Sequence, residues 1–516
     1  MRTLADAPLE YNAVEVLERN LASRRDKVAL FSPERSLTFG EVSAEVDLVA
    51  RALVEKLGVR MGEHLAILSL DGAEWAATFF GIVKAGGVAV SINTMVPSGD
   101  LAYILRDCRA RVLFVHDSLL PVLDEVRAEQ RFLEHVVVVG SPGRAGDTAY
   151  VDLVRDVAPG FEGAPTHRDD LCMLNYSSGT TGEPKGIPHA HKDLPITGQL
   201  YAVEGIGLRE SDTTFSVAKL FFTYGSCGNM IWPWCIGASV IFQPAPSRVA
   251  TNLLEMIARF RPTVFNGVPT SYATMLALDG MTERYDLSSI RMCISAGESL
   301  PIPVWEAWKA ATGHEICEGI GTTENLALYL VNRAGDVRPG SVGKPVPGYE
   351  LRIVDDAGQP VAQGEAGVLH LKGETTALQY LHQYERSRQT FLGEWVSTGD
   401  RFLVDADGFY HYVGRADDML KVGGIWVSPI EIEHTLTAHA AVLECAVIGH
   451  PDASGLIKPK AFVVLNAGYE RSDTLARALV DHCGQVMASF KRPRWIEFVD
   501  ELPRTATGKV QRSRLK

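Results

Sequence analysis

The sequence predicts an α/β protein, with a large N-terminal body and a smaller unit at its C-terminal end. Three observations support this fold class: alternating apolar runs and helical patterns, hairpin-like strands over 341–413, and a compact mixed pattern after residue 418. The chain has 516 residues, enough to bury a large core and to leave a cleft between units.

Apolar runs and helical patterns alternate through the first 320 residues. Runs rich in Val, Ile and Leu predict strands at 64–70, 88–93, 111–116, 135–140, 262–269, 290–297 and 314–321. Helical spacing predicts helices at 72–87, 100–108 and 303–313. Continuous apolar runs are typical of parallel strands covered on both faces, so we expect a body of parallel α/β sheets.

The pattern of predicted strands and helices changes twice after this body. Between 341 and 413, short strands joined by Asp-Gly and Ala-Gly turns predict a small β-barrel-like region. Beyond 418, helices near 430–439 and 475–483 and strands near 443–449, 460–465 and 494–500 predict an α+β unit. We therefore divide the chain into an N-terminal domain (1–414), a hinge (415–418) and a mobile C-terminal lid (419–516).

Composition excludes several classes of protein. With 50 basic and 63 acidic residues, the net charge of −13 lacks the basic footprint of a nucleic-acid-binding protein. Eight cysteines without a CxxC pair indicate free thiols in a reducing compartment. The uncharged stretch Leu220–Ser247 is long enough to cross a bilayer, but its polar, Gly and Pro residues predict a buried segment beside an apolar pocket. We expect a soluble, cytoplasmic protein without membrane or nucleic-acid partners.

The strongest local signal runs from Ser177 to Gly186, with the sequence SSGTTGEPKG, between a predicted strand at 171–176 and a predicted helix. Backbone N–H groups of small residues, hydroxyls and a lysine together suit a polyphosphate. Pro184 and Gly186 break the GxxxxGK[ST] pattern, which argues against a P-loop kinase or GTPase. On composition alone, a flexible linker stays open.

Ordered motifs identify the chain as a member of the AMP-forming acyl-CoA synthetase superfamily, which includes luciferase and peptide-synthetase adenylation units. YSSGTTGEPKG closely resembles that family's phosphate loop. Five further segments resemble family motifs and follow in the same order: SAGE (295–298), EGIGTTE (318–324), STGD (397–400), GRADDMLKVGG (414–424) and TATGKVQR (505–512).

The resemblance implies roles for individual residues, with ATP, Mg²⁺ and coenzyme A as reactants. Lys509 would be the adenylation lysine, Glu324 the Mg²⁺ ligand, and Lys185 a contact of the β and γ phosphates. Asp400 would hold the ribose hydroxyls, supported by Arg415. The complete set of expected ATP- or AMP-binding residues is Ser177, Ser178, Gly179, Thr180, Thr181, Gly182, Lys185, Ala296, Gly297, Glu298, Glu318, Gly319, Ile320, Thr323, Asp400, Arg415 and Lys509.

The family's hinge and thiol channel have counterparts too. Asp417 stands where the family hinges, and Gly423 and Gly424 would let a narrow pantetheine arm pass close to the backbone. Rotation of the lid would withdraw Lys509 after the first half-reaction and bring in the glycine face for the second. The histidine pair His189 and His191 lacks metal-spaced partners and is interpreted as a polar loop feature.

The acyl pocket is expected around KLFFTYG (219–225), because residues after this segment approach the acyl group in the family. The predicted lining is Phe221, Tyr224, Gly225, Gly321 and Ala327. Its aromatic character suits a flat aryl ring, and it offers no carboxylate for the ammonium group of an amino acid. This segment and GIGTTENLALYLVN (319–332) most resemble the benzoate-CoA ligase branch. Ala327 replaces a His often found there, which suggests space for a substituted benzoate, with 2-aminobenzoate (anthranilate) first.

We therefore predict an ATP-dependent aryl-CoA ligase, an AMP-forming acid–thiol ligase. It would form an acyl-AMP with release of pyrophosphate, and then pass the acyl group to the CoA thiol with release of AMP. Three alternatives stay open: transfer to a carrier-protein phosphopantetheine, a medium-chain fatty acyl-CoA synthetase, and a catalytically silent binding protein. An acyl carrier protein and a second copy of the chain are open as partners.

Overall fold

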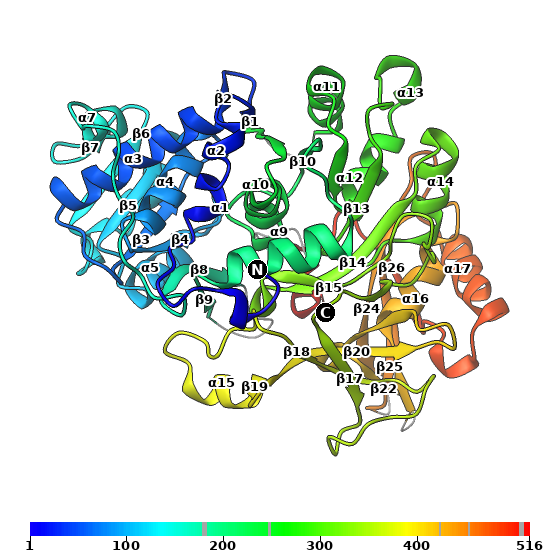
Figure 1. The fold of residues 1–516 in the computed structure, drawn as a ribbon. Coiled ribbons are helices and arrows are strands. Elements are labelled where there is room, and N and C mark those ends of the chain that lie inside the picture. The colour runs from blue at the N-terminus through cyan, green and yellow to red at the C-terminus, as the bar shows by residue number, and fades with distance from the viewer. Residues whose placement is uncertain (178–182, 246–248, 423–424, 453–454, 505–509, 516) are drawn as a thin grey trace.

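Two large sheets and their helices form the N-terminal body in the computed structural model, which describes residues 1–177, 183–245, 249–422, 425–452, 455–504 and 510–515 (Figure 1). In Figure 1 the first sheet lies at the left in blue to cyan, and the C-terminal unit lies at the right in orange and red. The predicted fold class, an α/β body with a smaller C-terminal unit, is confirmed.

The seven-stranded sheet has the order β7-β6-β5-β3-β4-β8-β9. Its strands are β3 (His64–Leu68), β4 (Val88–Ser91), β5 (Val112–His116), β6 (His135–Val139), β7 (Thr148–Ala149), β8 (Leu171–Ser177) and β9 (Lys185–Ala190). Every neighbouring pair is parallel except β8 and β9. Apolar side chains of α3 (Phe39–Glu55) and α4 (Ala73–Lys84) pack on one face, and those of α5 (Ser98–Asp107) pack on the other. The strands are therefore covered on both faces, as predicted.

The nine-stranded sheet has the order β16-β15-β14-β13-β12-β10-β11-β1-β2. Its strands are β1 (Val28–Phe31), β2 (Ser36–Thr38), β10 (Thr213–Ser216), β11 (Ser239–Ile241), β12 (Val264–Gly267), β13 (Met292–Ser295), β14 (Ile316–Thr322), β15 (Ala327–Val331) and β16 (Lys344–Pro345). Strands β1 and β10 to β14 are parallel, whereas β2, β15 and β16 join the ends antiparallel.

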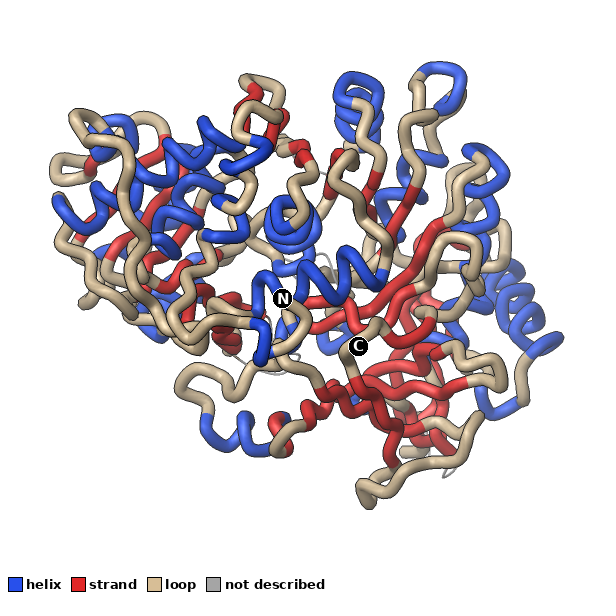
Figure 2. Tube along the Cα trace, in the orientation of Figure 1, coloured by secondary structure: helices blue, strands red, loops and turns tan. Residues whose placement is uncertain are grey.

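Helices surround these sheets (Figure 2). The shorter ones in the first half are α1 (Glu15–Glu18), α2 (Leu21–Arg24), α6 (Leu120–Asp124), α7 (Tyr150–Val154), α8 (Asp193–Thr197), α9 (Thr223–Ser226), α10 (Trp232–Cys235) and the π-helices η4 (Gly198–Gly205) and η5 (Cys227–Ile231). Those beside the later strands are α11 (Ala250–Phe260), α12 (Pro269–Leu276), α13 (Met281–Arg284) and α14 (Ile302–Thr312). Short 3₁₀ turns are η1 (Leu4–Asp6), η2 (Asp117–Leu119), η3 (Arg127–Glu129), η6 (Thr323–Asn325), η7 (Ala416–Asp418), η8 (Ser489–Lys491) and η9 (Arg512–Arg514).

An antiparallel sheet follows the body. It contains β17 (Glu350–Val354), β18 (Gly367–Lys372), β19 (Phe391–Leu392), β20 (Trp395–Val404) and β21 (Tyr410–Arg415), with α15 (Tyr384–Thr390) between β18 and β19. The C-terminal unit contains β22 (Leu420–Val422), β23 (Ile425–Val427), α16 (Pro429–Thr437), β24 (Val442–Pro451), β25 (Ile457–Leu465), α17 (Asp473–Val486) and β26 (Trp495–Phe498). Strands β24, β25 and β26 form its main sheet. Apolar side chains of this sheet and of helices α16 and α17 form a hydrophobic core that is separate from the core of the body.

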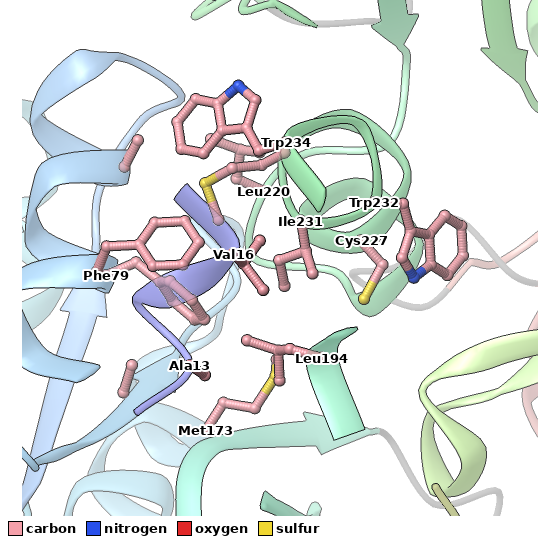
Figure 3. Close-up of a cluster of buried hydrophobic side chains, with 14 of the residues drawn as sticks. Ala13, Val16, Phe79, Met173, Leu194, Leu220, Cys227, Ile231, Trp232 and Trp234 are labelled. Atoms are coloured by element: carbon pink, nitrogen blue, oxygen red, sulfur yellow. The ribbon is translucent and has the colours of Figure 1, made fainter. Parts of the chain in front are cut away.

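Most of the described residues in the uncharged segment Leu220–Ser247 are buried. Trp232 and Trp234 are buried, and Leu220, Cys227 and Ile231 join the same apolar cluster, as Figure 3 shows. In the described parts of the chain, none of the helices combines the length and apolarity needed to cross a membrane.

One predicted element is wrong. The segment after the phosphate loop forms strand β9 instead of a helix, because Lys185–Ala190 pairs antiparallel with β8. This strand lies at the edge of its sheet, where Pro188, which lacks an N–H group, is tolerated. The loop therefore connects a hairpin, and its two ends lie side by side.

Candidate active site

The ends of the phosphate loop are fixed by the β8–β9 hairpin. Ser177 closes β8 and lies opposite Lys185, the first residue of β9. The tip of the loop, which includes the expected phosphate-binding residues Ser178, Gly179, Thr180, Thr181 and Gly182, lies outside the described residues. The hairpin nevertheless puts Lys185, the predicted phosphate contact, at the base of the loop.

Lys185 and Glu324 form a partly buried ion pair, although 139 residues separate them in the chain. Lys185 Nζ lies 2.7 Å from Glu324 Oε1, and Glu324 is 9% exposed. Burial alone would raise the pKa of Glu324, but the charge of Lys185 and hydrogen bonds from Lys185, Tyr380 and the backbone N–H of Glu324 lower it to about 2. The predicted metal ligand is therefore an ionised carboxylate beside the predicted phosphate lysine.

Tyr380 completes this cluster, and sequence reasoning missed it. Its hydroxyl donates to Glu324 Oε1 at 2.7 Å and accepts from Lys185 Nζ at 3.0 Å. The Lys185 ammonium also lies 4.6 Å from the centre of the Tyr380 ring. Tyr380 lies outside every motif recognised in the sequence, and its partner Glu324 is 56 residues away in the chain. No local sequence pattern therefore indicates that the two residues meet.

Glu324 sits in a tight turn between two paired strands. β14 leads into the 3₁₀ turn η6, and Leu326 takes a left-handed conformation (φ 60°) before β15 begins. His189 Nε2 lies 2.7 Å from the Thr323 carbonyl oxygen, while its Nδ1 lies 3.2 Å from Asp193 Oδ2. His189 therefore braces the turn that carries Glu324.

The interpretation of His189 and His191 as a polar loop feature is wrong. His189 belongs to β9, His191 directly follows it, and both are buried. His191 Nδ1 accepts a hydrogen bond from the Ala13 N–H at 2.9 Å. Within the described ranges, no cluster of three or more His, Cys, Asp or Glu side chains could hold a metal by itself.

The predicted adenine-side turn follows β13. Gly297 has φ +92°, a conformation that favours glycine, and Ala296 is buried beside it. Glu318 supports the turn from beneath, since its Oε1 accepts the Leu300 N–H at 2.9 Å. Burial raises the pKa of Glu318 to about 8. The Glu318 side chain is thus a buried brace, and Gly319 and Ile320 continue the same strand.

The expected ribose site is built on two paired strands. Asp400 on β20 lies opposite Arg415, the last residue of β21. Arg415 Nη1 lies 3.2 Å from Asp400 Oδ1, and the Tyr412 hydroxyl donates to the same oxygen at 3.3 Å. Arg415 Nη2 is 4.0 Å from Asp417 Oδ2, at the expected hinge. Asp400, Arg415 and Asp417, which belong to two separate motifs, are therefore brought together.

The predicted acyl-pocket residues come from two regions. Phe221 and Gly225 are buried, and the Tyr224 hydroxyl donates to the Gly267 carbonyl at 3.3 Å. A side chain on Gly225 would clash, since a Cβ there would stand 1.9 Å from the Lys219 oxygen. On the β14–β15 hairpin, Gly321 lies at a bulge where a Cβ would meet the Ala327 oxygen at 2.3 Å.

A polar residue of this region escaped the sequence analysis. Asn266 on β12 is 4% exposed, and its Nδ2 donates to the Gly228 carbonyl at 3.2 Å. Its amide oxygen accepts no hydrogen bond from the part of the chain that the structure describes. The uncharged segment Leu220–Ser247 is therefore in contact with at least one polar side chain, that of Asn266 on β12.

The C-terminal unit lies against the adenine-side turn. Arg504 Nη1 is 3.5 Å from Glu298 Oε1, and Ser299 Oγ is 3.1 Å from His434 Nε2 on α16. Lys509, Gly423 and Gly424, on which the adenylation and thiol-channel predictions fall, lie outside the described residues. The described residue before the Lys509 segment, Arg504, thus contacts the expected nucleotide site.

This architecture defines a class of enzyme: an AMP-forming ligase with a two-sheet body, a strand pair that carries Asp400 and Arg415, and a small C-terminal unit. The AMP-binding enzyme family model matches residues 17–381, and the model of the AMP-binding enzyme C-terminal domain matches 431–509. The chain belongs to the AMP-binding enzyme family. The predicted enzyme class, an AMP-forming acid–thiol ligase, is confirmed.

Several relatives match nearly the whole chain. Benzoate–CoA ligase of Thauera aromatica is 44% identical over 99% of this chain and 96% of its own. The 4-hydroxybenzoate–CoA/benzoate–CoA ligase of Rhodopseudomonas palustris (strain ATCC BAA-98 / CGA009) is 41% identical over 98% and 94%. The crystal structure of the anthranilate CoA ligase AuaEII, in complex with anthranoyl-AMP, has a TM-score of 0.95 and 56% identity over 99% and 98%. The resemblance to the benzoate-CoA ligase branch is confirmed.

Proposed function

We propose that this protein is an ATP-dependent aryl-CoA ligase. A carboxylate oxygen of the aromatic acid attacks the α-phosphorus of ATP, which gives acyl-AMP and releases pyrophosphate. The CoA sulfur then attacks the acyl carbon, a thioester forms, and AMP leaves. The observation that carries the proposal is the buried, ionised Glu324 held by Lys185 on the strand that follows the phosphate loop.

Glu324 suits a Mg²⁺ ion carried by the nucleotide. Mg²⁺ prefers hard oxygen ligands and is commonly held by one or two carboxylates together with substrate phosphates. A pKa of about 2 keeps Glu324 anionic at any working pH, and its Oε2 accepts no hydrogen bond from another described residue. The bound ion would neutralise charge on the phosphates.

The remaining roles follow the contacts. Lys185 leaves Glu324 for the β and γ phosphates when ATP enters, and Asp400 accepts the ribose hydroxyls while Arg415 holds its carboxylate. Lys509 bridges the carboxylate and the α-phosphate during adenylation. Gly423 and Gly424 line the path of the pantetheine arm.

The domain division supports these two half-reactions. We place the N-terminal domain at 1–414, the hinge at 415–418 around Asp417, and the lid at 419–516. The lid carries Lys509 to the nucleotide for the first step and away from it for the second.

For the acid, we propose a substituted benzoate, with 2-aminobenzoate first. Ala327 is 4% exposed and small, and the anthranilate CoA ligase AuaEII is 56% identical to this chain. Phe221 and Tyr224 supply aromatic surface, and the Asn266 amide oxygen, which accepts from none of the described residues, offers one hydrogen-bond acceptor.

The test is pyrophosphate release with a panel of acids: 2-aminobenzoate, benzoate, 4-hydroxybenzoate and octanoate, each with Mg²⁺ and ATP. We expect the highest kcat/KM with 2-aminobenzoate. A preference for octanoate over every aryl acid would overturn the proposal and favour the fatty acyl alternative.

The acceptor is tested separately. AMP release that depends on added CoA, with no carrier protein present, is expected for the ligase. Adenylation of the acid without any CoA-dependent turnover would instead favour transfer to a carrier-protein phosphopantetheine, and the absence of both would favour a binding protein.

A further inference from the structure

The two oxygens of Glu324 have different surroundings. Lys185 Nζ and the Tyr380 hydroxyl both donate to Oε1, each at 2.7 Å. Oε2 accepts no hydrogen bond from another residue in the described ranges, although Glu324 is largely buried. Oε1 is therefore anchored by two side chains, whereas Oε2 accepts from no other described residue and is open to a ligand.

Tyr380 is held rigidly by its own neighbours. It is 3% exposed and packs with Ile187 and Ala377, and its ring centre lies 5.0 Å from that of Phe391. Its backbone N–H donates to Ser387 Oγ at 2.9 Å. The adjoining chain is tied to the same turn, since the Ala377 N–H donates to the Glu324 carbonyl at 2.8 Å. The hydroxyl is consequently aimed by packing and by backbone bonds together.

We propose that Tyr380 is a positioning residue for metal-nucleotide binding: its hydroxyl holds Glu324 Oε1, so that Oε2 stays available to a nucleotide-bound divalent cation. The inference rests on the proposed role of Glu324 as the metal ligand. Lys185 cannot both pair with Glu324 and move to the phosphates without loosening its 2.7 Å contact. Once Lys185 moves, Tyr380 is the remaining donor to Oε1 among the described residues.

Without this hydroxyl, binding of ATP would strand a buried carboxylate oxygen. An unpaired buried acceptor is costly, and hydrogen bonds to charged groups are stronger than neutral ones. The cost would fall on the metal-nucleotide complex, because in the free protein Lys185 still satisfies Oε1. Tyr380 would thus matter more for the bound state than for the fold.

The test compares Tyr380→Phe, which keeps the ring and its packing, with Tyr384→Phe, a matched change at a residue that is 77% exposed. Calorimetry measures binding of Mn²⁺·ATP, and of ATP in excess EDTA, with no acid present. We expect Tyr380→Phe to weaken Mn²⁺·ATP about 10- to 100-fold and to leave metal-free ATP unchanged. Tyr384→Phe should match the wild type in both titrations.

Each other outcome has a meaning. Equal Mn²⁺·ATP affinities for Tyr380→Phe and the wild type would overturn the inference, as would an equal loss with metal-free ATP. If Glu324→Gln binds Mn²⁺·ATP normally, the metal assignment itself fails, which is a separate result. Thiolysis of supplied acyl-AMP by CoA should be retained in Tyr380→Phe. If that variant does not fold, Ser387→Ala, which removes only the anchor of the Tyr380 N–H, is expected to weaken Mn²⁺·ATP selectively.

Discussion

Two buried carboxylates, six residues apart on one strand and its turn, have opposite ionisation states because their neighbours differ. Glu324 has a pKa of about 2, because Lys185 and Tyr380 donate to it. Glu318 has a pKa of about 8, because burial dominates and, among the described residues, the Leu300 N–H is its one donor. The motif EGIGTTE fixes both positions, but it contains no information about which partners arrive from elsewhere in the chain.

The state of Glu318 predicts a pH dependence of stability. Its folded pKa of about 8 exceeds the ordinary value of 4.5, so the folded protein binds the proton more tightly than the unfolded chain does. The favourable contribution is complete below pH 4.5 and declines as the pH rises through 8. Glu318→Gln keeps an acceptor for Leu300 and does not ionise. Thermal midpoints at pH 5, 7 and 9 should therefore move in favour of the variant as pH rises; a constant difference would contradict the raised pKa.

At the scale of elements, apolar runs predicted the parallel strands and the helices between them, because strand and helix periods differ. The hairpin β8–β9 was mistaken for a strand followed by a helix, since KGIPHA is short and its pairing depends on β8. The same limit applies to the site. The motif order brought Lys185 and Glu324 into one prediction, whereas Tyr380 and His189 act through contacts that no local pattern encodes.

The β14–β15 hairpin predicts a change of substrate preference. Ala327 opposes Thr322 next to the bulge at Gly321, and it is buried. Ala327→Val adds volume beside the expected ring and should lower kcat/KM for 2-aminobenzoate about 10-fold relative to benzoate. A change of this size is typical when one methylene group is added to or removed from a substrate pocket. Ala89→Val, a buried change on β4 of the other sheet, is the control for overpacking. The control should lower stability without changing the ratio, and an unchanged ratio in Ala327→Val would remove this residue from the pocket.

At the scale of the whole molecule, the C-terminal unit meets the body at the adenine-side turn. Contacts of Arg504 with Glu298 and of Ser299 with His434 join two regions that the sequence assigns to separate domains. The net charge of −13 does not argue against a nucleotide site, because a few lysines and backbone amides are enough to bind phosphates locally whatever the charge of the whole chain. The Arg504–Glu298 contact places these two residues, which lie 206 positions apart in the chain, next to each other.

This arrangement makes the two half-reactions separable by mutation of the C-terminal unit. Lys509 follows closely after Arg504, which touches the expected nucleotide site, and the transition state of adenylation brings two anions together. Lys509→Ala should therefore lower acyl-AMP formation about 100- to 1000-fold and spare thiolysis of supplied acyl-AMP. Lys491→Ala is the matched control, since Lys491 pairs with Glu431 on the surface of the same unit and such pairs contribute little. Pyrophosphate release and CoA-dependent AMP release, measured separately, decide the matter: adenylation at the wild-type rate in Lys509→Ala would refute the role given to this lysine.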